Sequence, residues 1–290
     1  MTVRYARWIA LFLAPTLLFF LAFYAYPIIT VFISSFADWR LASSMSFVGF
    51  DNYASLGTDA DFAAGLAHTL LWLVIHWVVY VGMGLAVAVM TANGSRFSRF
   101  VRTAYLLPNM IPIAALAFLF YFIFNPSIGP INGFLEAVGL ERWALNWYQD
   151  TRTAFLTVTL TSVLYGGILC LLFAAEISAI PAEVYESAKI DGSSELRTAF
   201  SITLPLLRNM IGTAMILTTV HVLKSFEIIY LTTVGGPGND TVNLPILIFR
   251  MAMNNNNLGY SNTIAVVTIV IGVVSIAMIS RAFRMGTSYQ

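Results

Sequence analysis

An uninterrupted run of uncharged residues from Trp8 to Ala37 limits what this chain can fold into. Arg7 and Asp38 bound the run, and at about 1.5 Å rise per residue a helix of this length is longer than a bilayer core is thick. A secretory signal has a shorter apolar region and a small-residue cleavage site, so we interpret the run as a retained first helix.

Five further apolar runs follow, and together they predict a polytopic membrane protein. The chain is 59% hydrophobic and only 10% charged, whereas about a quarter of the residues in a soluble domain are charged. Because lipid offers no hydrogen bonds to the backbone, each run is expected to be helical. We therefore predict an all-α fold, a single transmembrane domain over residues 1–290. Its six transmembrane helices are expected at 8–37, 66–92, 103–124, 154–176, 208–234 and 263–281.

The charge balance and the cysteine content exclude several other classes of protein. A net charge of +1 gives no reason to expect a nucleic-acid partner. Cys170 is the sole cysteine and lies in an apolar run, so neither a disulfide framework nor a thiolate metal site is expected. No catalytic or metal-binding constellation is recognisable, so we predict that the chain is not an enzyme.

The distribution of basic residues between the loops predicts the orientation in the membrane. Ten lie at the termini and in one alternating set of loops: Arg4, Arg7, Arg96, Arg99, Arg102, Lys189, Arg197, Arg208, Arg281 and Arg284. The other loops hold Arg40, Arg142, Arg152 and Arg250 among many acidic residues. Both termini and the segment 177–205 are therefore expected on the cytoplasmic side.

The segment EVYESAKIDGSSELRTAFSITLPLL, which begins at Glu183, concentrates charge between two apolar runs. Asp191-Gly192 is expected to end a first short helix, because glycine takes left-handed backbone angles at little cost. Ser193 or Ser194 can cap a second. These residues leave two interpretations open. One is an amphipathic helix on the lipid surface, and the other is a docking element for a cytoplasmic partner.

The pattern Glu-Ser-Ala-x-x-Asp-Gly, followed nine residues later by Ile-Thr-Leu-Pro, resembles the EAA loop of binding-protein-dependent ABC importer permeases. A second alanine is more usual in the family where Ser187 stands. The resemblance implies the type I importer permease fold and an ATPase-coupling role for this loop. The matching residues are Glu186, Ser187, Ala188, Asp191, Gly192, Ile202, Leu204 and Pro205.

The resemblance extends along nearly the whole chain and points to the sugar-importing, maltose-type branch. NNNNLGY, from Asn254, departs from the shorter glycine-containing link that is usual there. The segments that carry the likeness are Tyr26-Pro27, FVGFDNY at 47–53, Arg102-Thr103 with Leu107-Pro108, Pro126 with Gly129 and Asn132, and IYLTTVGGPGNDT at 229–241.

Membership of this branch would imply several partners in a prokaryotic cytoplasmic membrane. They are a second permease subunit forming a heterodimer, two ATP-binding subunits and an extracytoplasmic solute-binding protein. The chain has no Gly-x-x-x-x-Gly-Lys-Ser/Thr motif, so no cofactor is expected in it, and ATP and magnesium would belong to the partners. The expected cargo is a di- or oligosaccharide or a related carbohydrate, with a glycerol phosphate or a polyol as the alternative.

Ionisable residues at membrane depth are functional candidates, and the fifth expected helix holds His221, Lys224 and Glu227. The resemblance places ligand contacts on the fourth and fifth helices. The candidate pathway residues are Ser162, Tyr165, His221, Lys224, Ser225 and Glu227. A structural interpretation stays open, in which Lys224 pairs with Glu227 and His221 only packs. His68 and His76 lack a convergent acid, and we interpret them as packing residues.

Two other functions remain open from the sequence. A stand-alone secondary transporter or channel would explain Lys224 and Glu227, but it would leave the EAA-like loop without a role. Such transporters also tend to carry internal repeats, and none is visible here. Alternatively, the chain could couple to the ATPase without touching the ligand.

The orientation gives the first testable prediction. We expect single cysteines at Thr58 and Asn255 to react with a membrane-impermeant thiol reagent in intact cells, because both positions lie in loops with few basic residues. Reaction of both sites only after permeabilisation would reverse the predicted topology.

Overall fold

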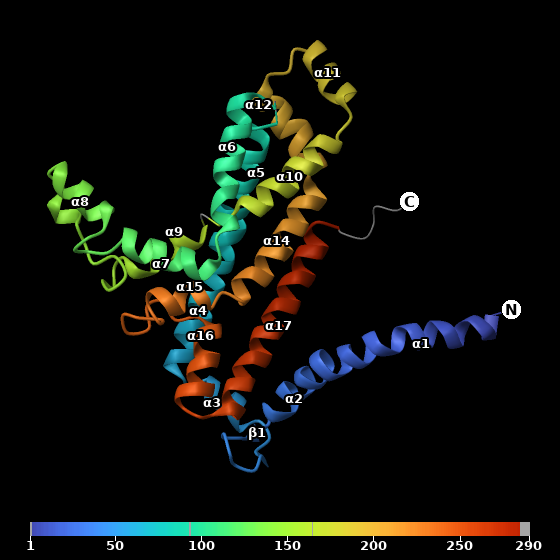
Figure 1. Cartoon of the computed structure of the whole chain (residues 1–290), viewed down its shortest axis with the longest axis vertical. Helices are drawn as coiled ribbons and strands as arrows, with labels where there is room; N and C mark the ends of the chain where they lie inside the picture. The colour runs from blue at the N-terminus through green and yellow to red at the C-terminus, as the bar shows by residue number, and fades with distance from the viewer. Residues whose placement is uncertain (1, 93, 164, 285–290) are drawn as a thin grey trace. The chain divides into compact units, whose positions relative to one another are not determined.

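The computed structural model describes residues 2–92, 94–163 and 165–284, and it is almost entirely helical (Figure 1). The expected all-α fold is confirmed, since the strands in the described part are a single pair of two residues each. The residues form two compact units. One comprises Met1–Ala63 with Leu247–Val270, and the other comprises Ala64–Ile246 with Ile271–Gln290. Helices α4 (Ala60–Ile75), α16 (Leu244–Phe249) and α17 (Leu258–Ala282) contribute residues to both units.

Four helical stretches of the described chain are long and apolar enough to cross a membrane by themselves. Two further candidates are pairs of helices bent sharply at a short break. When each bent pair is counted as one span, the total is six, as the sequence predicted. The four stretches are Leu11–Ser34, Ala60–Met90, Ala154–Ala179 and Leu258–Ala282, and the pairs are Arg96–Met110 with Ile113–Ile123 and Glu195–Leu206 with Arg208–Leu223.

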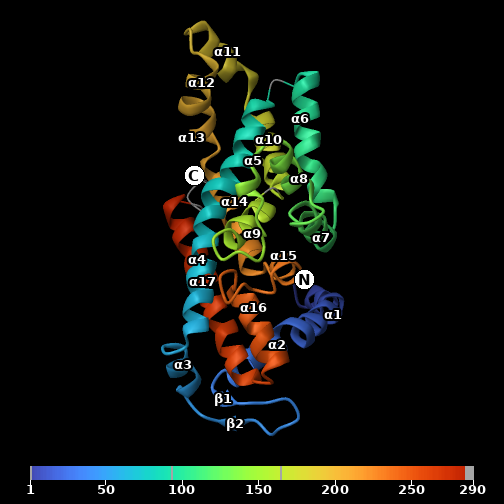
Figure 2. The same cartoon turned by 90° about the vertical axis from the view of Figure 1, so that its left-hand side faces the viewer.

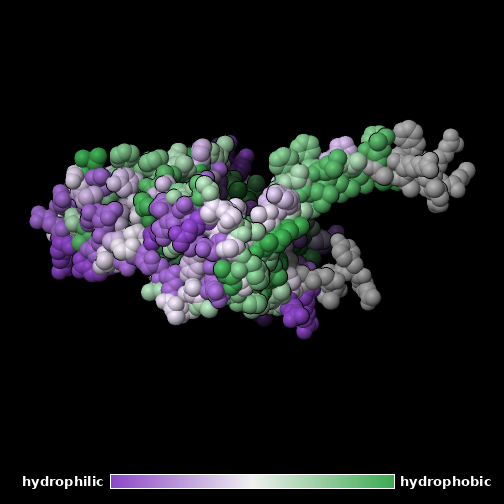
Figure 3. All heavy atoms as spheres, turned by 90° about the horizontal axis from the view of Figure 1, so that it is seen from below, coloured by the Kyte–Doolittle hydropathy of each residue, from purple (hydrophilic) through white to green (hydrophobic). Residues whose placement is uncertain are grey.

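The first unit begins with one long helix whose described surface is apolar (Figure 3). It runs through α1 (Thr2–Phe20), the π turn η1 (Leu21–Ala25) and α2 (Tyr26–Ser34). Pro27 has no amide hydrogen to donate to the preceding turn, and the wider π turn lies directly before it. Phe12 is 80% exposed, and most large side chains of this helix are similarly open, so the helix needs lipid or another chain around it.

Side-chain and backbone hydrogen bonds hold the rest of the first unit. The remaining elements are the antiparallel pair β1 (Ala37–Asp38) and β2 (Ser46–Phe47), α3 (Asp51–Leu56) and the π turn η6 (Arg250–Asn254). The Asn52 amide donates to the carbonyl oxygens of Ser35 (3.0 Å) and Ala37 (2.9 Å). The Thr263 hydroxyl of α17 donates to the same Ser35 oxygen at 3.0 Å. These bonds tie the end of α2 to α17.

The core of the second unit forms where α5 (Val81–Met90) lies along α10 (Gly167–Ala179) (Figures 1 and 2). Gly84 permits this approach, because a Cβ there would lie 3.0 Å from the Cβ of Leu169. Phe173 and Cys170 are fully buried in the resulting cluster, against which α14 (Arg208–Leu223) also packs. The other elements are η2 (His76–Tyr80), α6 (Arg96–Leu106), η3 (Leu107–Met110), α7 (Ile113–Ile123), α8 (Pro130–Ala137), η4 (Glu141–Trp143), α9 (Ala154–Val163), α11 (Ala182–Ile190), α12 (Glu195–Thr198), η5 (Ala199–Thr203), α13 (Leu204–Leu206) and α15 (Glu227–Thr232).

Three of the expected helices are interrupted. Pro108 and Pro112 predict the break in the third from the sequence, whereas the apolar sequences of the other two do not reveal theirs. The third bends by 103° between Met110 and Ile113, where Pro112 cannot continue a helix. In the fourth, Tyr165 and Gly166 are not helical, and α10 begins at Gly167. The fifth does not reach Val234. It ends at Leu223, and the following Ser225 carbonyl oxygen accepts a 2.6 Å bond from the Asn243 amide instead of a helical partner.

The second and sixth helices start earlier than their apolar runs. α4 begins at Ala60, because the Asp59 carboxylate accepts the N–H groups of Asp61 (2.8 Å) and Phe62 (3.1 Å) and caps the helix. α17 begins at Leu258, where Asn257 accepts the Tyr260 N–H at 3.1 Å. In both cases a polar cap extends the helix beyond the hydrophobic stretch.

Gly259 gives a test of the first unit. A Cβ at this position would overlap the Ala37 carbonyl oxygen and lie 3.1 Å from the Trp39 nitrogen, and backbone cannot move aside as a flexible side chain can. We expect Gly259→Ala to destabilise the chain by about 3 kcal/mol, the cost of overpacking. Thermal unfolding in detergent measures the change. Gly82→Ala is the matched control, because a Cβ on that helical glycine meets nothing within 4 Å.

Candidate functional site

The EAA-like segment, residues 177–205, forms short helices at one end of the second unit, beyond α10 (Figures 1 and 2). α11 ends in a Schellman motif. The Ser193 N–H donates to the Ala188 carbonyl oxygen at 2.9 Å, and the Gly192 N–H donates to that of Lys189 at 3.0 Å. Gly192 has the left-handed φ of +73° that this motif requires. The expected helix break at Asp191-Gly192 is confirmed.

Side chains fix the return from α11 toward the membrane helices. Ser194 caps α12, and its hydroxyl accepts the Arg197 N–H at 3.3 Å. The hydroxyls of Tyr185 and Thr203 lie 3.3 Å apart and join α11 to η5. The segment therefore has a defined shape rather than that of a loose loop.

The surface of this segment mixes charge with large apolar groups. Of the residues that carry the EAA resemblance, Ala188 is buried, Ile202 and Leu204 are half-buried, and Glu186, Ser187, Asp191, Gly192 and Pro205 are exposed. Three apolar side chains beside them are open to the surroundings: Ile190 at 86%, Leu196 at 74% and Phe200 at 67%. Apolar anchors with a charged rim are typical of protein interfaces.

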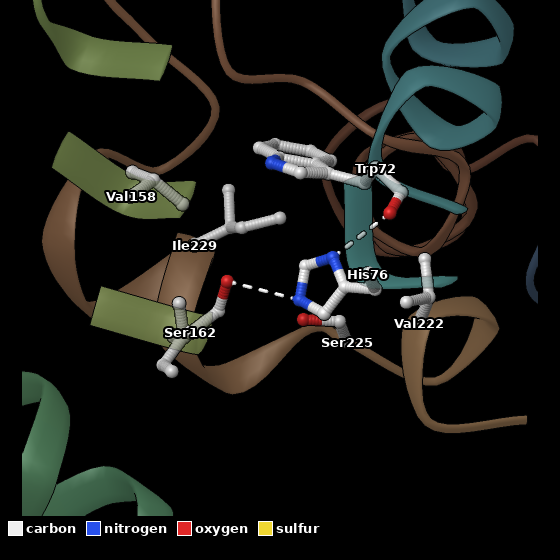
Figure 4. Close-up of a pocket in the computed structure, with 8 residues that line it drawn as sticks. Trp72, His76, Val158, Ser162, Val222, Ser225 and Ile229 are labelled. Carbon is white, nitrogen blue, oxygen red and sulfur yellow. Dashed lines mark hydrogen bonds between the residues drawn. The ribbon is translucent and has the colours of Figure 1, made fainter. Parts of the chain in front are cut away.

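A small pocket lies deeper in the second unit, where several helices meet (Figure 4). α4, η2 and α9 supply half of its lining, and the end of α14, the turn after it and α15 supply the rest. The volume is about 10 Å³, which is about the size of one water molecule. A sugar does not fit in this conformation. The lining residues are Trp72, His76, Val158, Ser162, Val222, Ser225, Ile228 and Ile229.

His76 is the centre of the hydrogen bonds in this pocket (Figure 4). Its Nδ1 lies 2.8 Å from the Trp72 carbonyl oxygen, and its Nε2 lies 3.1 Å from the Ser162 hydroxyl oxygen. A carbonyl only accepts, so Nδ1 carries a proton, and in the neutral ring Nε2 accepts from Ser162. The Thr159 carbonyl oxygen, 2.8 Å from the same hydroxyl, competes for its single proton. The Ser162 hydroxyl can donate to only one of these two acceptors, so a hydroxyl group that enters the pocket can donate to the other.

Tyr80 connects the pocket to two other predicted residues. Its ring stacks on His221 with centroids 5.7 Å apart, and His221 lies 6.3 Å from the ring of His76. The Tyr80 hydroxyl donates to the Tyr165 carbonyl oxygen at 3.0 Å. Ser162 and Ser225 line the pocket and His221 lies next to it, while their contact with a substrate stays a prediction. The Tyr165 hydroxyl instead donates to the Ile111 carbonyl oxygen at 3.2 Å.

Lys224 and Glu227 lie next to the pocket in the chain, but they do not line it and both are exposed. No ion pair joins them in the part of the chain that the structure describes, so the expected structural pair is not formed. Each charge instead suits its helix end. Lys224 follows the negative end of α14, and Glu227 opens the positive end of α15.

A second hollow, of about 20 Å³, lies in the predicted outer loops. Aromatic rings and amide side chains line it, a chemistry that suits sugars, but its volume holds only one or two water molecules. Burial raises the pKa of Tyr148 in this hollow to about 12, so its hydroxyl stays neutral beside that of Thr161, 3.0 Å away. The lining residues are Tyr121, Phe124, Asn125, Pro126, Asn146, Tyr148 and Gln149.

A family model described as "Binding-protein-dependent transport system inner membrane component" matches residues 79–284, which include the pocket residues from Val158 onward and the whole EAA-like segment. The chain belongs to this permease family. The resemblance drawn from the EAA pattern is thereby confirmed.

Relatives of this permease align along almost their full length. "Probable ABC transporter permease protein YurN" of Bacillus subtilis is 33% identical, over 95% of this chain and 96% of its own. "Sulfoquinovosyl glycerol transport system permease protein SmoG" of Agrobacterium fabrum is 29% identical, over 97% and 94%. "Diacetylchitobiose uptake system permease protein NgcF" of Streptomyces coelicolor is 28% identical, over 94% and 81%.

The fold of the permease also matches a solved structure. A chain of a bacterial ABC transporter involved in the import of the acidic polysaccharide alginate superposes with a TM-score of 0.86, at 22% identity, over 99% of this chain and 98% of its own. At this identity the likeness supports the fold, and it confirms the importer permease architecture that the sequence predicted.

Trp72, His76 and Tyr80 are pocket-region residues that sequence reasoning missed. They lie four residues apart, which places them on one face of a helix. The useful signal was the histidine itself, because an ionisable side chain within a transmembrane segment usually faces the protein interior. The search for a nearby acid was the error, since the partners of His76 are a hydroxyl and a carbonyl.

Lys224 gives a test of the pathway. We expect Lys224→Ala to change uptake by about tenfold, as for loss of a hydrogen bond to a charged group, while the amount of assembled permease stays normal. The structure gives Lys224 no ion pair whose loss would unfold the chain. Uptake of the carbohydrate bound by the cognate binding protein, together with the permease level in membranes, measures both effects. Loss of the protein from membranes would indicate a structural role instead.

Proposed function

We propose that this permease is the transmembrane subunit of an ATP-driven importer that moves a carbohydrate delivered by an extracytoplasmic solute-binding protein. The observation that carries the proposal is the EAA-like segment, which holds a defined shape and presents Ile190, Leu196 and Phe200 beside exposed charges. A helix lying on lipid would bury such apolar groups on one face, whereas a cleft on an ATP-binding subunit can accommodate both kinds of group.

The substrate class follows from the relatives and from the pocket. Relatives are named for transport of sulfoquinovosyl glycerol, diacetylchitobiose and starch degradation products. The lining of the pocket is neutral apart from His76, and only Lys224 and His221 lie close enough to add positive charge. A phosphorylated cargo needs a stronger cationic lining. We therefore favour a neutral di- or oligosaccharide over a glycerol phosphate, and a neutral polyol stays the alternative.

The energy source lies in partner chains under this proposal. The permease carries no phosphate-binding loop, so two ATP-binding subunits would hold ATP and magnesium. A second, different permease subunit would complete the passage and cover apolar helix surface that is exposed in this chain. The whole chain would act as one permease domain.

The proposed orientation places both termini and the EAA-like segment in the cytoplasm of a prokaryotic cell. The Arg208 guanidinium donates to the Ala282 carbonyl oxygen at 2.7 Å, so the start of α14 and the end of α17 lie together, as two cytoplasmic ends would. The basic residues of these ends favour the same side.

Two alternatives differ in testable ways. A stand-alone secondary transporter would have no use for the EAA-like segment, and it should function without an ATP-binding subunit. A permease that couples but contacts no ligand would leave Ser162, His221 and Ser225 without influence on uptake.

Gly192 and Glu186 test the proposed coupling. We expect Gly192→Val to abolish most of the stimulation of ATPase activity by loaded binding protein. A β-branched residue at φ +73° costs at least about 1–2 kcal/mol, so the chain should relieve this strain by tilting α12. Glu186→Lys should also lower this stimulation of ATPase activity, and it should leave the chain folded because the Glu186 side chain is exposed.

The matched control is Gly94→Val, at another left-handed glycine (φ +65°) with open space around it. It carries similar backbone strain outside the EAA-like segment and should keep normal stimulation. The measurement uses the reconstituted complex, with copurification of the ATP-binding subunit as a second readout. Normal ATPase stimulation in both Gly192→Val and Glu186→Lys would indicate that the segment is only an amphipathic helix on the lipid surface.

A further inference from the structure

Two interrupted helices of the second unit are hydrogen-bonded to each other at their interruptions. The third span turns through η3, Ile111 and Pro112 before α7, and the fourth is interrupted between α9 and α10. Each interruption frees backbone donors and acceptors, which inside a membrane must find partners within the protein.

The Asn109 side-chain amide bonds both sides of the fourth-span interruption. The amide is oriented so that its oxygen faces a donor, because the opposite orientation would place its NH2 against the Gly167 N–H; its nitrogen then donates to the Tyr165 carbonyl oxygen at 2.8 Å, and its oxygen accepts from the Gly167 N–H at 2.9 Å. One amide from the third span thus takes the place of a missing peptide partner in the fourth.

Tyr165 returns a bond to the third span. Its hydroxyl lies 3.2 Å from the Ile111 carbonyl oxygen and 3.4 Å from that of Asn109. We call Asn109 and Tyr165 the brace. Each residue uses its side chain to satisfy backbone at the interruption of the other helix.

Two glycines let the fourth span approach the third closely, Gly167 against backbone and Gly166 against a side chain. A Cβ on Gly167 would lie 2.7 Å from the Tyr105 carbonyl oxygen and 2.9 Å from the Cα of Leu106. A Cβ on Gly166 would lie 2.5 Å from the Tyr105 hydroxyl oxygen. Because the two spans are in such close contact here, one interruption cannot shift without moving the other.

The brace lies between the two candidate sites along the chain. Ser162, about one turn earlier on α9, lines the pocket. α10 runs from Gly167 to Ala179 and leads into the EAA-like segment. Because α10 packs along α5 over a buried core, it can transmit a displacement as a rigid body.

We propose that Asn109 and Tyr165 are positioning residues that pass a movement of the EAA-like segment, through α10, to the pocket. They do so by keeping the interruptions of the third and fourth spans together. The inference rests on the proposed function, since it takes an ATP-binding subunit to move that segment. It gives Tyr165 a different role from the sugar contact suggested by the sequence.

The test is the number of ATP molecules hydrolysed per sugar imported by the reconstituted complex. We expect Asn109→Ala and Tyr165→Phe to raise this ratio about fivefold, the effect of losing one hydrogen bond, and the double variant to be little worse than either. Tyr105→Phe is the matched control. Its hydroxyl is buried beside the same glycines, yet it has no hydrogen-bond partner among the described residues, so its removal should leave the ratio unchanged.

Cys170 provides a second readout that needs no substrate. It is the only cysteine in the chain, lies about one turn beyond Gly167 and is fully buried. In the assembled complex without ATP, we expect a membrane-permeant maleimide to react with Cys170 about fivefold faster in Asn109→Ala and Tyr165→Phe, and at the normal rate in Tyr105→Phe.

Unchanged coupling and an unchanged Cys170 reaction in Tyr165→Phe would overturn the inference, as would an equal change in Tyr105→Phe. Tyr165→Phe removes a single hydroxyl, so it decides the matter even where Asn109→Ala fails to assemble. A wild-type complex that imports no sugar would count against the proposed function. The rate at which maleimide reacts with Cys170 would still test whether Asn109 and Tyr165 hold the two interruptions together.

Discussion

The interior of a membrane offers no hydrogen bonds to a peptide backbone, and this chain meets that constraint with side chains that bond the backbone where helices of the second unit stop. Asn109 bonds both sides of the fourth-span interruption, and Asn243 donates to the carbonyl oxygen of Ser225 after α14. Without them, the Gly167 N–H and the Ser225 carbonyl oxygen would lose these partners, and an unpaired polar group in a membrane interior is costly. The interruptions therefore exist because the second unit supplies these partners.

The interruptions in turn create the pocket. Ser225 lies in the turn after α14, and Ser162 lies at the end of α9, just before the next interruption. Shortened helices leave room that continuous ones would fill, and His76 from the facing helix bonds Ser162 across it. Polar groups at membrane depth thus occur where regular helix ends, as in other transporters with discontinuous helices.

The EAA-like segment is not subject to this constraint, because it is expected outside the lipid, where water can bond exposed backbone groups. Gly192 supplies the left-handed angle and Ser194 supplies the cap, so its two helices need little help from the rest of the chain. A locally determined shape suits an element that must keep its form while its surroundings move. α10 then connects this stable element to the brace and the pocket.

The sequence by itself determined the membrane class, the approximate position of six spans and the shape of the EAA-like segment, because apolar run length and capping residues act locally. It also brought Ser162, His221 and Ser225 into one candidate site. Pro112 marks the break in the third helix, but only the tertiary structure decided where the fourth breaks, since apolar composition is the same on both sides of Tyr165 and the break is stable only if Asn109, distant in sequence, satisfies it. For the same reason, His76 became a pocket residue through a serine on another helix, and Lys224 and Glu227 lie at the ends of two helices instead of pairing on one.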